Sequence, residues 1–172
     1  MAGTYPAYTR VISSPLGELW LCATDKGVCA IHFGDPDAKV LRGLRRYGAI
    51  PAPTPSHPIL DAAAVQLAEY FAQERQEFLV PLDLLGTPFQ RSVWEALLAI
   101  PYGETHTYGG LAALLGRPRA ARAVGRAVGT NRVNILVPCH RVIGRDGTLT
   151  GYGGGLERKR ALLHLEGVML EV

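Results

Sequence analysis

Thr107-Tyr-Gly-Gly-Leu-Ala-Ala-Leu-Leu-Gly116, followed directly by Arg117-Pro-Arg-Ala-Ala-Arg-Ala-Val-Gly-Arg-Ala-Val128, predicts the fold of the second half of the chain. Thr107 suits the cap of a short helix that Gly116 ends. Pro118 suits the first turn of a second helix running to about Val128. Two short helices joined by a tight Gly-Arg-Pro turn indicate a helix-turn-helix, although short helix pairs also occur in other α-rich domains.

The second of these helices has two different faces. Arg119, Arg122 and Arg126 recur at three- and four-residue spacing, which places them on one side of a helix. Val124 and Val128 fall on another side. The pattern predicts a buried valine face and a basic surface face.

The charge around this helix is one-sided. The chain has a net charge of only +3, yet no carboxylate occurs between Glu104 and Asp146. That interval contains seven arginines: Arg117, Arg119, Arg122, Arg126, Arg132, Arg141 and Arg145. Such a field suits a polyanion such as nucleic acid. The alternative is an ordinary solvated basic face.

The rest of the chain predicts an α/β unit over residues 1–85 and a mostly helical unit over residues 86–172. Segments rich in apolar and β-favouring residues predict strands over 8–12, 18–22, 28–33 and 78–82. Helical periodicity or composition predicts helices over 37–47, 61–73, 88–100 and 156–165. Residues 49–58 contain four prolines and are expected to form an extended connection.

The run Asn131-Arg-Val-Asn-Ile-Leu-Val-Pro-Cys-His-Arg-Val-Ile-Gly144 contains the strongest candidate for chemistry. The apolar stretch looks like a strand that ends at Pro138, which is expected to project Cys139 from the strand end rather than bury it. A neighbouring histidine and positive charge favour a thiolate. The alternative is a small buried hydrophobic cysteine, the interpretation that suits Cys22 and Cys29.

A cysteine–histidine pair needs a third group to orient the imidazole. Glu166 is the best candidate, because a carboxylate at a helix C-terminus opposes the helix dipole and is therefore expected to have a partner. An exposed surface glutamate is the alternative. Cys139 and His140 are adjacent, so on an extended backbone their side chains diverge. They can meet only through a turn or a bridging water.

Composition excludes several classes of protein. The three cysteines show no metal-type spacing, which argues against a metal site and a disulfide framework. No apolar run of the length that a membrane span requires is present, and residues 1–10 do not resemble a signal peptide. We therefore expect a cytoplasmic protein with no membrane partner, no metal and no cofactor.

Several short motifs occur together in a specific order. They are Phe89-Gln-x-x-Val-Trp94, Ile100-Pro-Tyr-Gly103, Thr107-Tyr108, Ala120-Ala-Arg-Ala-Val-Gly125, Pro138-Cys-His-Arg-Val142 and Gly151-Tyr-Gly-Gly-Gly-Leu156. In this order and spacing the chain resembles the O6-alkylguanine-DNA alkyltransferases. The resemblance is strong over residues 86–167 and looser over the first 85, where Ser14-Pro-Leu-Gly17 and the following hairpin match.

The resemblance implies a fold and an activity. The fold would be an RNase-H-like α/β N-terminal domain, with a small antiparallel sheet plus helices, and a mostly α C-terminal winged helix-turn-helix domain. The activity would be repair of double-stranded DNA carrying O6-alkylguanine by a monomer that binds the minor groove. The damaged base would be flipped out, and its alkyl group would move irreversibly onto Cys139. A thioether has no carbonyl for water to attack, so each chain would act once.

The resemblance also implies a role for individual residues. His140 would act as the base through a bridging water, with Glu166 orienting it and Asn131 steadying the turn. Tyr108 would contact the flipped nucleotide and donate towards guanine N3. Arg122 would fill the gap that the extruded base leaves in the duplex. Three further positions match contacts to DNA or substrate: Gly109, Arg117 and Gly153.

Two departures from the family pattern carry expectations. Tyr5 and Thr24 stand at early positions where some members have zinc ligands, leaving only Cys29 in place, so we expect no zinc. Gly153 replaces a serine near the alkyl pocket of some members, which predicts tolerance of groups larger than methyl. Two other functions remain open from the residues alone, namely a non-reactive damage sensor and a cysteine hydrolase.

Overall fold

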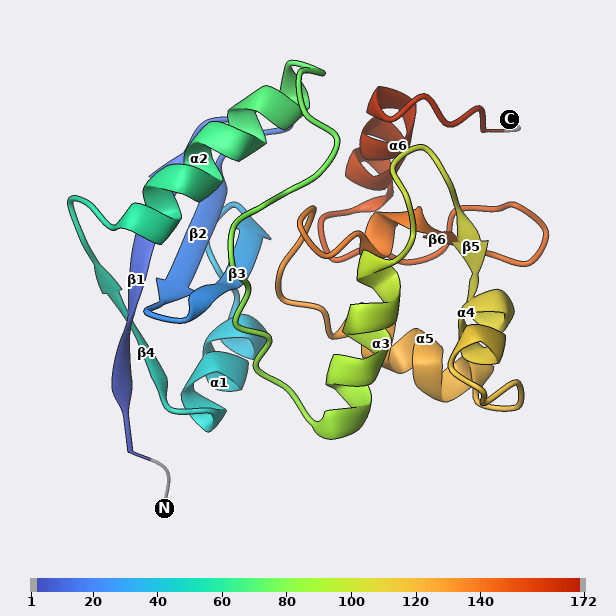
Figure 1. Cartoon of the computed structure of the whole chain (residues 1–172), viewed down its shortest axis with the longest axis horizontal. Coiled ribbons are helices and arrows are strands. Elements are labelled where there is room, and N and C mark those ends of the chain that lie inside the picture. The colour runs from blue at the N-terminus through green and yellow to red at the C-terminus, as the bar shows by residue number, and fades with distance from the viewer. Residues whose placement is uncertain (1–2, 171–172) are drawn as a thin grey trace. The chain divides into compact units, whose positions relative to one another are not determined.

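A computed structural model describes residues 3–170 of the chain (Figure 1). Internal contacts divide it into two units, one ending at Gly86 and one beginning at Thr87. Each unit has its own sheet and helices. Among the described residues, none of the helices combines the length and apolar composition required to cross a lipid bilayer.

The first unit is built on a four-stranded sheet in the order β3-β2-β1-β4. The strands are β1 (Tyr5–Ile12), β2 (Leu19–Thr24), β3 (Gly27–Phe33) and β4 (Ala49–Pro53). The β1–β2 and β2–β3 pairs are antiparallel, whereas β4 runs parallel to β1. The expected antiparallel sheet is therefore wrong in one respect, because the sheet is mixed.

The proline-rich segment is extended, as expected, but it is a strand and not only a connection. Pro51 and Pro53 lack an N–H, and β4 tolerates them because it is an edge strand with a neighbour on one side only. The prediction of a strand over residues 78–82 is wrong. Only an isolated bridge joins Leu82 to Val28, with Pro81 interrupting the run of donors.

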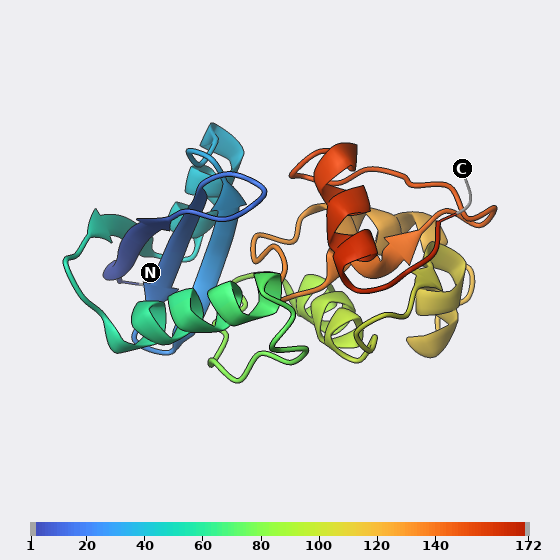
Figure 2. The same ribbon diagram turned by 90° about the horizontal axis from the view of Figure 1, so that it is seen from above.

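Two helices complete the first unit. Helix α1 (Ala38–Arg46) is capped by Asp37, which accepts a hydrogen bond from the amide of Val40. Helix α2 (Pro58–Phe71) contacts β1, β2 and β3 and lies along the sheet in Figure 2. It begins three residues earlier than expected, because His57 caps it by accepting from the amide of Ile59.

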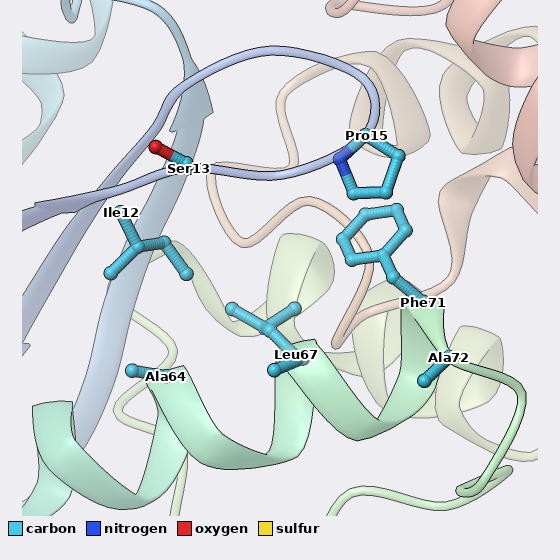
Figure 3. Close-up of a pocket in the computed structure, with 8 residues that line it drawn as sticks. Ile12, Ser13, Pro15, Ala64, Leu67, Phe71 and Ala72 are labelled. Atoms are coloured by element: carbon cyan, nitrogen blue, oxygen red, sulfur yellow. The ribbon is translucent and has the colours of Figure 1, made fainter.

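An apolar groove of about 470 Å³ lies between α2 and the end of β1 with its following loop. Its lining residues are Ile12, Ser13, Pro15, Ala64, Leu67, Ala68, Phe71 and Ala72. Figure 3 shows the Pro15 ring against the ring of Phe71, with Ile12 on the strand side of the groove and Leu67 on the helix side. Leu67 is fully buried, so the groove opens directly onto the core between the helix and the sheet.

The second unit is mostly helical. Its elements are α3 (Pro88–Leu98), β5 (His106–Thr107), α4 (Tyr108–Leu114), α5 (Ala121–Gly129), the 3₁₀ helix η1 (Cys139–Arg141), β6 (Val142–Ile143) and α6 (Leu156–Leu165). The Thr87 and Gln90 side chains form a capping box at the start of α3. Strands β5 and β6 pair in parallel over two residues.

Helices α4 and α5 pack against each other, as Figure 1 shows. Thr107 caps α4 by accepting from the Gly110 amide at 2.9 Å, and Gly116 ends it with a φ of 71°. Helix α5 starts at Ala121, later than expected, because Pro118 lies in a turn closed by the hydrogen bond from the Ala120 amide to the Arg117 carbonyl.

The faces of α5 agree with the sequence pattern. Val124 and Val128 are buried, whereas Arg122 and Arg126 are exposed. Arg119 is also exposed but precedes the helix, in the turn. The basic side of the helix is therefore a surface.

The strand expected between Asn131 and Pro138 is absent. This segment is irregular and buried, and Ile135 has a φ of 73°, which no strand contains. Residues 145–148 form a turn in which the Gly144 amide donates to the Thr148 carbonyl at 2.8 Å, and none of the described residues after the turn forms a strand that pairs with β6.

Candidate active site

Cys139 opens the 3₁₀ helix η1 and is only 8% exposed. Its amide donates to the carbonyl of Val137, and Pro138 (φ −81°, ψ 61°) turns the chain into the helix. The prediction that Pro138 projects Cys139 outward from a strand end is therefore wrong. The proline serves a buried turn instead.

Burial decides the proton affinity of the Cys139 thiol. Loss of solvent raises its pKa above the usual value, while a hydrogen bond from Asn131 and the nearby Lys159 ammonium act in the opposite direction. The surroundings that were expected to favour a thiolate do not outweigh burial. Cys139 consequently needs a base to become a nucleophile.

Asn131 holds the buried turn from inside. Its Oδ1 accepts from the amide of Val133 at 2.9 Å, and its Nδ2 donates to the carbonyl of Val137 at 3.1 Å. The same amide group donates to the Cys139 thiol. One side chain therefore ties the two ends of the irregular segment together beside the sulfur.

The His140 side chain reaches the end of α6. Its Nε2 lies 2.6 Å from Oε2 of Glu166, and both side chains are fully buried. Burial lowers the pKa of the His140 imidazole, against the opposing influence of Glu166, so the ring is neutral at physiological pH. A neutral ring that donates Nε2–H to a carboxylate presents a lone pair at Nδ1.

The Nδ1 atom of His140 is buried and has no hydrogen-bond partner among residues 3–170. Buried polar atoms in proteins are nearly always paired with protein or ordered water. This atom is therefore a site for a small hydrogen-bonding molecule next to the cysteine turn.

Arg141 fixes the charge of Glu166. Its Nε donates to Oε1 at 2.7 Å and its Nη2 to Oε2 at 3.1 Å, a two-pronged ion pair. Its Nη1 donates to the carbonyl of Ile100 at 2.7 Å. The amide of Gly103 also donates to Oε1 of Glu166, at 3.4 Å. Arg141 was grouped with the free basic residues of its interval, and that grouping is wrong, because it is buried and paired.

Lys159 is a fully buried cation on α6 that the sequence analysis did not single out. Its Nζ donates to the carbonyl of Thr150 at 2.6 Å. Burial lowers the pKa of Lys159 to about 8, and the electrostatic influence of Cys139 opposes that shift. A lysine that remains protonated here lowers the pKa of the neighbouring thiol.

Tyr108 begins α4, and its Oη accepts a hydrogen bond from Oγ1 of Thr150 at 3.0 Å. Its ring lies beside Gly125 of α5, where a β-carbon would be 3.5 Å from Cδ1. Tyr108 thus stands between the α4–α5 pair and the segment that accepts the hydrogen bond of Lys159.

The remaining predicted residues are at the surface. Gly109, Arg117 and Arg122 are exposed on α4, the following turn and α5. The Arg117 guanidinium lies 5.5 Å from the centre of the Phe89 ring. Gly153 is exposed, and a β-carbon placed on it would have no atom within 4 Å. Within residues 3–170, no cluster of three or more histidine, cysteine or carboxylate side chains is suitable for a metal ion.

Both halves of the chain match models of known protein families. Residues 88–168 match the model of the 6-O-methylguanine DNA methyltransferase DNA binding domain, and residues 7–84 match that of the ribonuclease-like domain of the same proteins. The chain belongs to the 6-O-methylguanine DNA methyltransferase family. The resemblance drawn from the sequence motifs is confirmed.

Individual members of the 6-O-methylguanine DNA methyltransferase family are similar over nearly the whole chain. A methylated-DNA–protein-cysteine methyltransferase of Mycobacterium leprae is 57% identical over 159 residues, which cover 92% of each chain. That of Mycobacterium tuberculosis is 50% identical over 162 residues, which cover 91% of this chain and 90% of the relative.

Solved structures of family members have the same fold. The crystal structure of the Mycobacterium tuberculosis O6-methylguanine methyltransferase matches with a TM-score of 0.78 at 48% identity, covering 93% of this chain and 92% of that one. A structure of the Mycobacterium tuberculosis protein in complex with DNA matches with a TM-score of 0.79 at 48% identity, covering 92% of each chain. The two-domain architecture of the family is therefore shown.

Within this family member, the second unit brings four predicted residues to one place: Cys139, His140, Glu166 and Asn131. Three more residues belong to this site, and no sequence motif indicated a role for them there: Arg141, Lys159 and Thr150. A signal for Lys159 was present, because Lys159, Leu162, Leu163 and Glu166 are spaced by three, four and seven residues. That spacing puts the lysine on the face of α6 that carries the buried leucines and the buried glutamate.

Proposed function

We propose that this chain repairs DNA by direct reversal, as an enzyme that transfers the O6-alkyl group of guanine to Cys139. Relatives with half or more identical residues are named for methyl transfer from DNA to a protein cysteine. The observation that carries the assignment to Cys139 is the buried network next to it. His140, Glu166 and Arg141 form a hydrogen-bonded chain that leaves one imidazole nitrogen unpaired beside the cysteine turn.

The first step is removal of the thiol proton. A water molecule bridges Sγ of Cys139 and Nδ1 of His140, and the proton passes through it to the imidazole. Burial opposes both charges that this step creates, the thiolate and the imidazolium. Glu166 stabilises the imidazolium at Nε2, and Lys159 stabilises the thiolate. Arg141 keeps Glu166 ionised, so that the carboxylate orients the ring and does not take the proton itself.

The second step is alkyl transfer. The thiolate attacks the sp³ carbon of the alkyl group, a carbon–sulfur bond forms, and the bond from carbon to guanine O6 breaks with its electrons remaining on the base. Tyr108 donates towards N3 and stabilises the anionic guanine until it is reprotonated. The product on Cys139 is a thioether, which water does not cleave, so one chain repairs one lesion.

The DNA-binding face is formed by α4 and α5. We propose that they act as a helix-turn-helix in the minor groove, with residues 145–148 as the tip of a wing. The damaged base is flipped out, and Arg122 occupies its place in the stack. Gly109 and Arg117 contact the DNA beside it. The exposed arginines of this face supply phosphate contacts. A relative crystallised in complex with DNA supports DNA as the partner.

The two units have separate tasks in this proposal. Residues 86–172 hold the alkyl acceptor and the DNA-binding helices, and residues 1–85 form the N-terminal α/β domain, which we infer to be RNase-H-like. The alkyl pocket accepts groups larger than methyl, because Gly153 leaves open space where a side chain would stand. Gly153→Ser is expected to slow transfer of a benzyl group more than transfer of a methyl group.

Mass spectrometry tests the proposed function. The protein is incubated with a duplex containing O6-methylguanine, digested, and compared with a Cys139→Ser variant. The expected result is a gain of one methylene unit on the peptide that contains Cys139, and none in the variant. An unmodified protein, or an adduct only on Cys22 or Cys29, would rule the proposal out. Cys139 also distinguishes this chain from a non-reactive sensor, which needs no acceptor.

A further inference from the structure

We propose that Thr150 is a positioning residue that sets the direction in which Tyr108 donates its proton, and so accelerates departure of guanine from the alkyl group. The inference rests on the proposed function and adds a residue to it. No motif of the sequence analysis pointed to Thr150.

Thr150 is bonded to groups on both sides of the reaction. Its Oγ1 donates to Oη of Tyr108 at 3.0 Å, and its carbonyl accepts from Nζ of Lys159 at 2.6 Å. Lys159 interacts electrostatically with Cys139. One residue therefore links the leaving-group donor to the cation that supports the nucleophile.

These contacts hold the Thr150 hydroxyl in place. The bond from the buried Lys159 restrains the backbone at residue 150, and threonine is stiff at χ1 because its β-carbon is branched. Tyr108 is restrained as well, since it begins α4 and its ring lies beside Gly125. The hydrogen bond between the two hydroxyls thus joins two groups that are already fixed, so forming it costs little further conformational entropy.

The direction of this bond has a chemical consequence. A phenol oxygen carries one proton and accepts hydrogen bonds in the plane of its ring. Each hydroxyl of this 3.0 Å contact has one proton to donate, and the substrate selects the donor: when the Tyr108 proton is on guanine N3, Thr150 donates to Oη and occupies its accepting side. The same bond stabilises negative charge that develops on Oη as the proton moves towards guanine N3. Thr150 therefore makes Tyr108 both a directed donor and a stronger one.

Thr150→Val tests this, because valine keeps the shape and the backbone carbonyl and removes only the hydroxyl. Single-turnover transfer from free O6-benzylguanine is expected to be slower by about tenfold, the effect of one hydrogen bond. Thr150→Ser retains the hydroxyl and is expected to react within about twofold of the native protein. Alkylation of Cys139 by iodoacetamide is expected to be unchanged in both variants, since the bond from Lys159 remains.

A double-mutant cycle shows whether the effect passes through Tyr108. In a Tyr108→Phe background the Thr150→Val change is expected to have no further effect, because the bonded hydroxyl is already missing. Thr54→Val is the matched control. Thr54 is also half-buried, and its hydroxyl makes one hydrogen bond, to the carbonyl of Ser56 in the first unit. This control is expected to react at the native rate.

Three results would overturn the inference: native-rate transfer in Thr150→Val, an equal loss in the Tyr108→Phe background, or an equal loss in the iodoacetamide reaction. Where Thr150→Val does not fold, Thr150→Ala is measured against the same outcomes. Failure of the proposed function would look different, because the native protein itself would then transfer no alkyl group to Cys139.

Discussion

Nε2 of His140 lies 2.6 Å from Oε2 of Glu166, and neither side chain is exposed to solvent. The contact joins η1 to the C-terminal cap of α6. Because Arg141 holds the same carboxylate from the other side, the imidazole has a fixed orientation and a carboxylate that stays ionised. In the proposed function, the remaining ring nitrogen, Nδ1, which is buried and has no hydrogen-bond partner among residues 3–170, accepts the proton of Cys139 through water.

Arg141→Met is expected to destabilise the fold by about 3–5 kcal/mol, because it leaves Glu166 as a buried charge without its strongest partner. Urea unfolding measures the loss. Arg75→Met is a matched control, since Arg75 pairs with Glu69 in a partly exposed contact and its loss is expected to cost at most about 1 kcal/mol. Equal losses in the two variants would contradict a structural role for the buried pair.

Acid is expected to destabilise the fold through His140. The pKa of His140 is lowered in the folded state. As pH falls below the usual histidine value, His140 therefore becomes protonated in the unfolded chain while it is still neutral in the folded chain, which favours unfolding. The stability that His140 contributes is present above that value and is lost as pH falls towards the lowered pKa. The midpoint of urea unfolding is measured at about pH 7 and about pH 5. Between these two values the midpoint is expected to fall less in His140→Gln than in the native protein. The same fall in both proteins would show that other groups are responsible.

The elements of the fold that the sequence predicts correctly are those with local signals. Helices α4 and α6 were predicted because caps and apolar spacing are local signals. The strand β4 was missed because the four prolines of residues 49–58, two of them in the strand, argue against a sheet, and only the pairing with β1 reveals an edge strand. The segment around Ile135 was misread as a strand, since an apolar run alone does not distinguish a strand from a buried irregular loop.

The residues of the site also divide into those with a local signal in the sequence and those whose role depends on long-range contacts. Cys139, His140 and Glu166 were identified from residue type and position. Arg141 was not, because its partner lies 25 residues further along the chain and sequence alone assigned it to a basic surface. Thr150 was missed because its role depends on a contact with Tyr108 across 42 residues. Long-range contacts of this kind follow from the fold.

Lys159→Met is expected to move the reaction of Cys139 with iodoacetamide to higher pH, because the ammonium that lowers the pKa of the thiol is gone. At neutral pH, repair is expected to slow by severalfold. Lys39→Met, a change to a lysine of α1 in the first unit, is the control and is expected to leave the pH profile unaltered. An unchanged profile in Lys159→Met would show that the buried lysine does not act on the sulfur.

Arg122→Ala is expected to impair repair of duplex DNA more than reaction with free O6-benzylguanine. Only in the duplex does the flipped base leave a gap in the stack for Arg122 to fill. A loss of about tenfold or more on the duplex is expected, given that base flipping costs a few kcal/mol. Arg160→Ala, at an exposed arginine of α6, controls for the lost charge. Equal losses on the two substrates would exclude insertion of Arg122 into the stack.

A titration of repair against protein shows whether Cys139 is consumed by the reaction. Increasing amounts of a duplex containing O6-methylguanine are mixed with a fixed amount of the native chain, and the repaired guanine is counted at completion. The expected result is a plateau at one repaired base per chain, with Cys139 alkylated to the same extent and no repair by Cys139→Ser. Repair that continues beyond one equivalent, or that persists without Cys139, would contradict it.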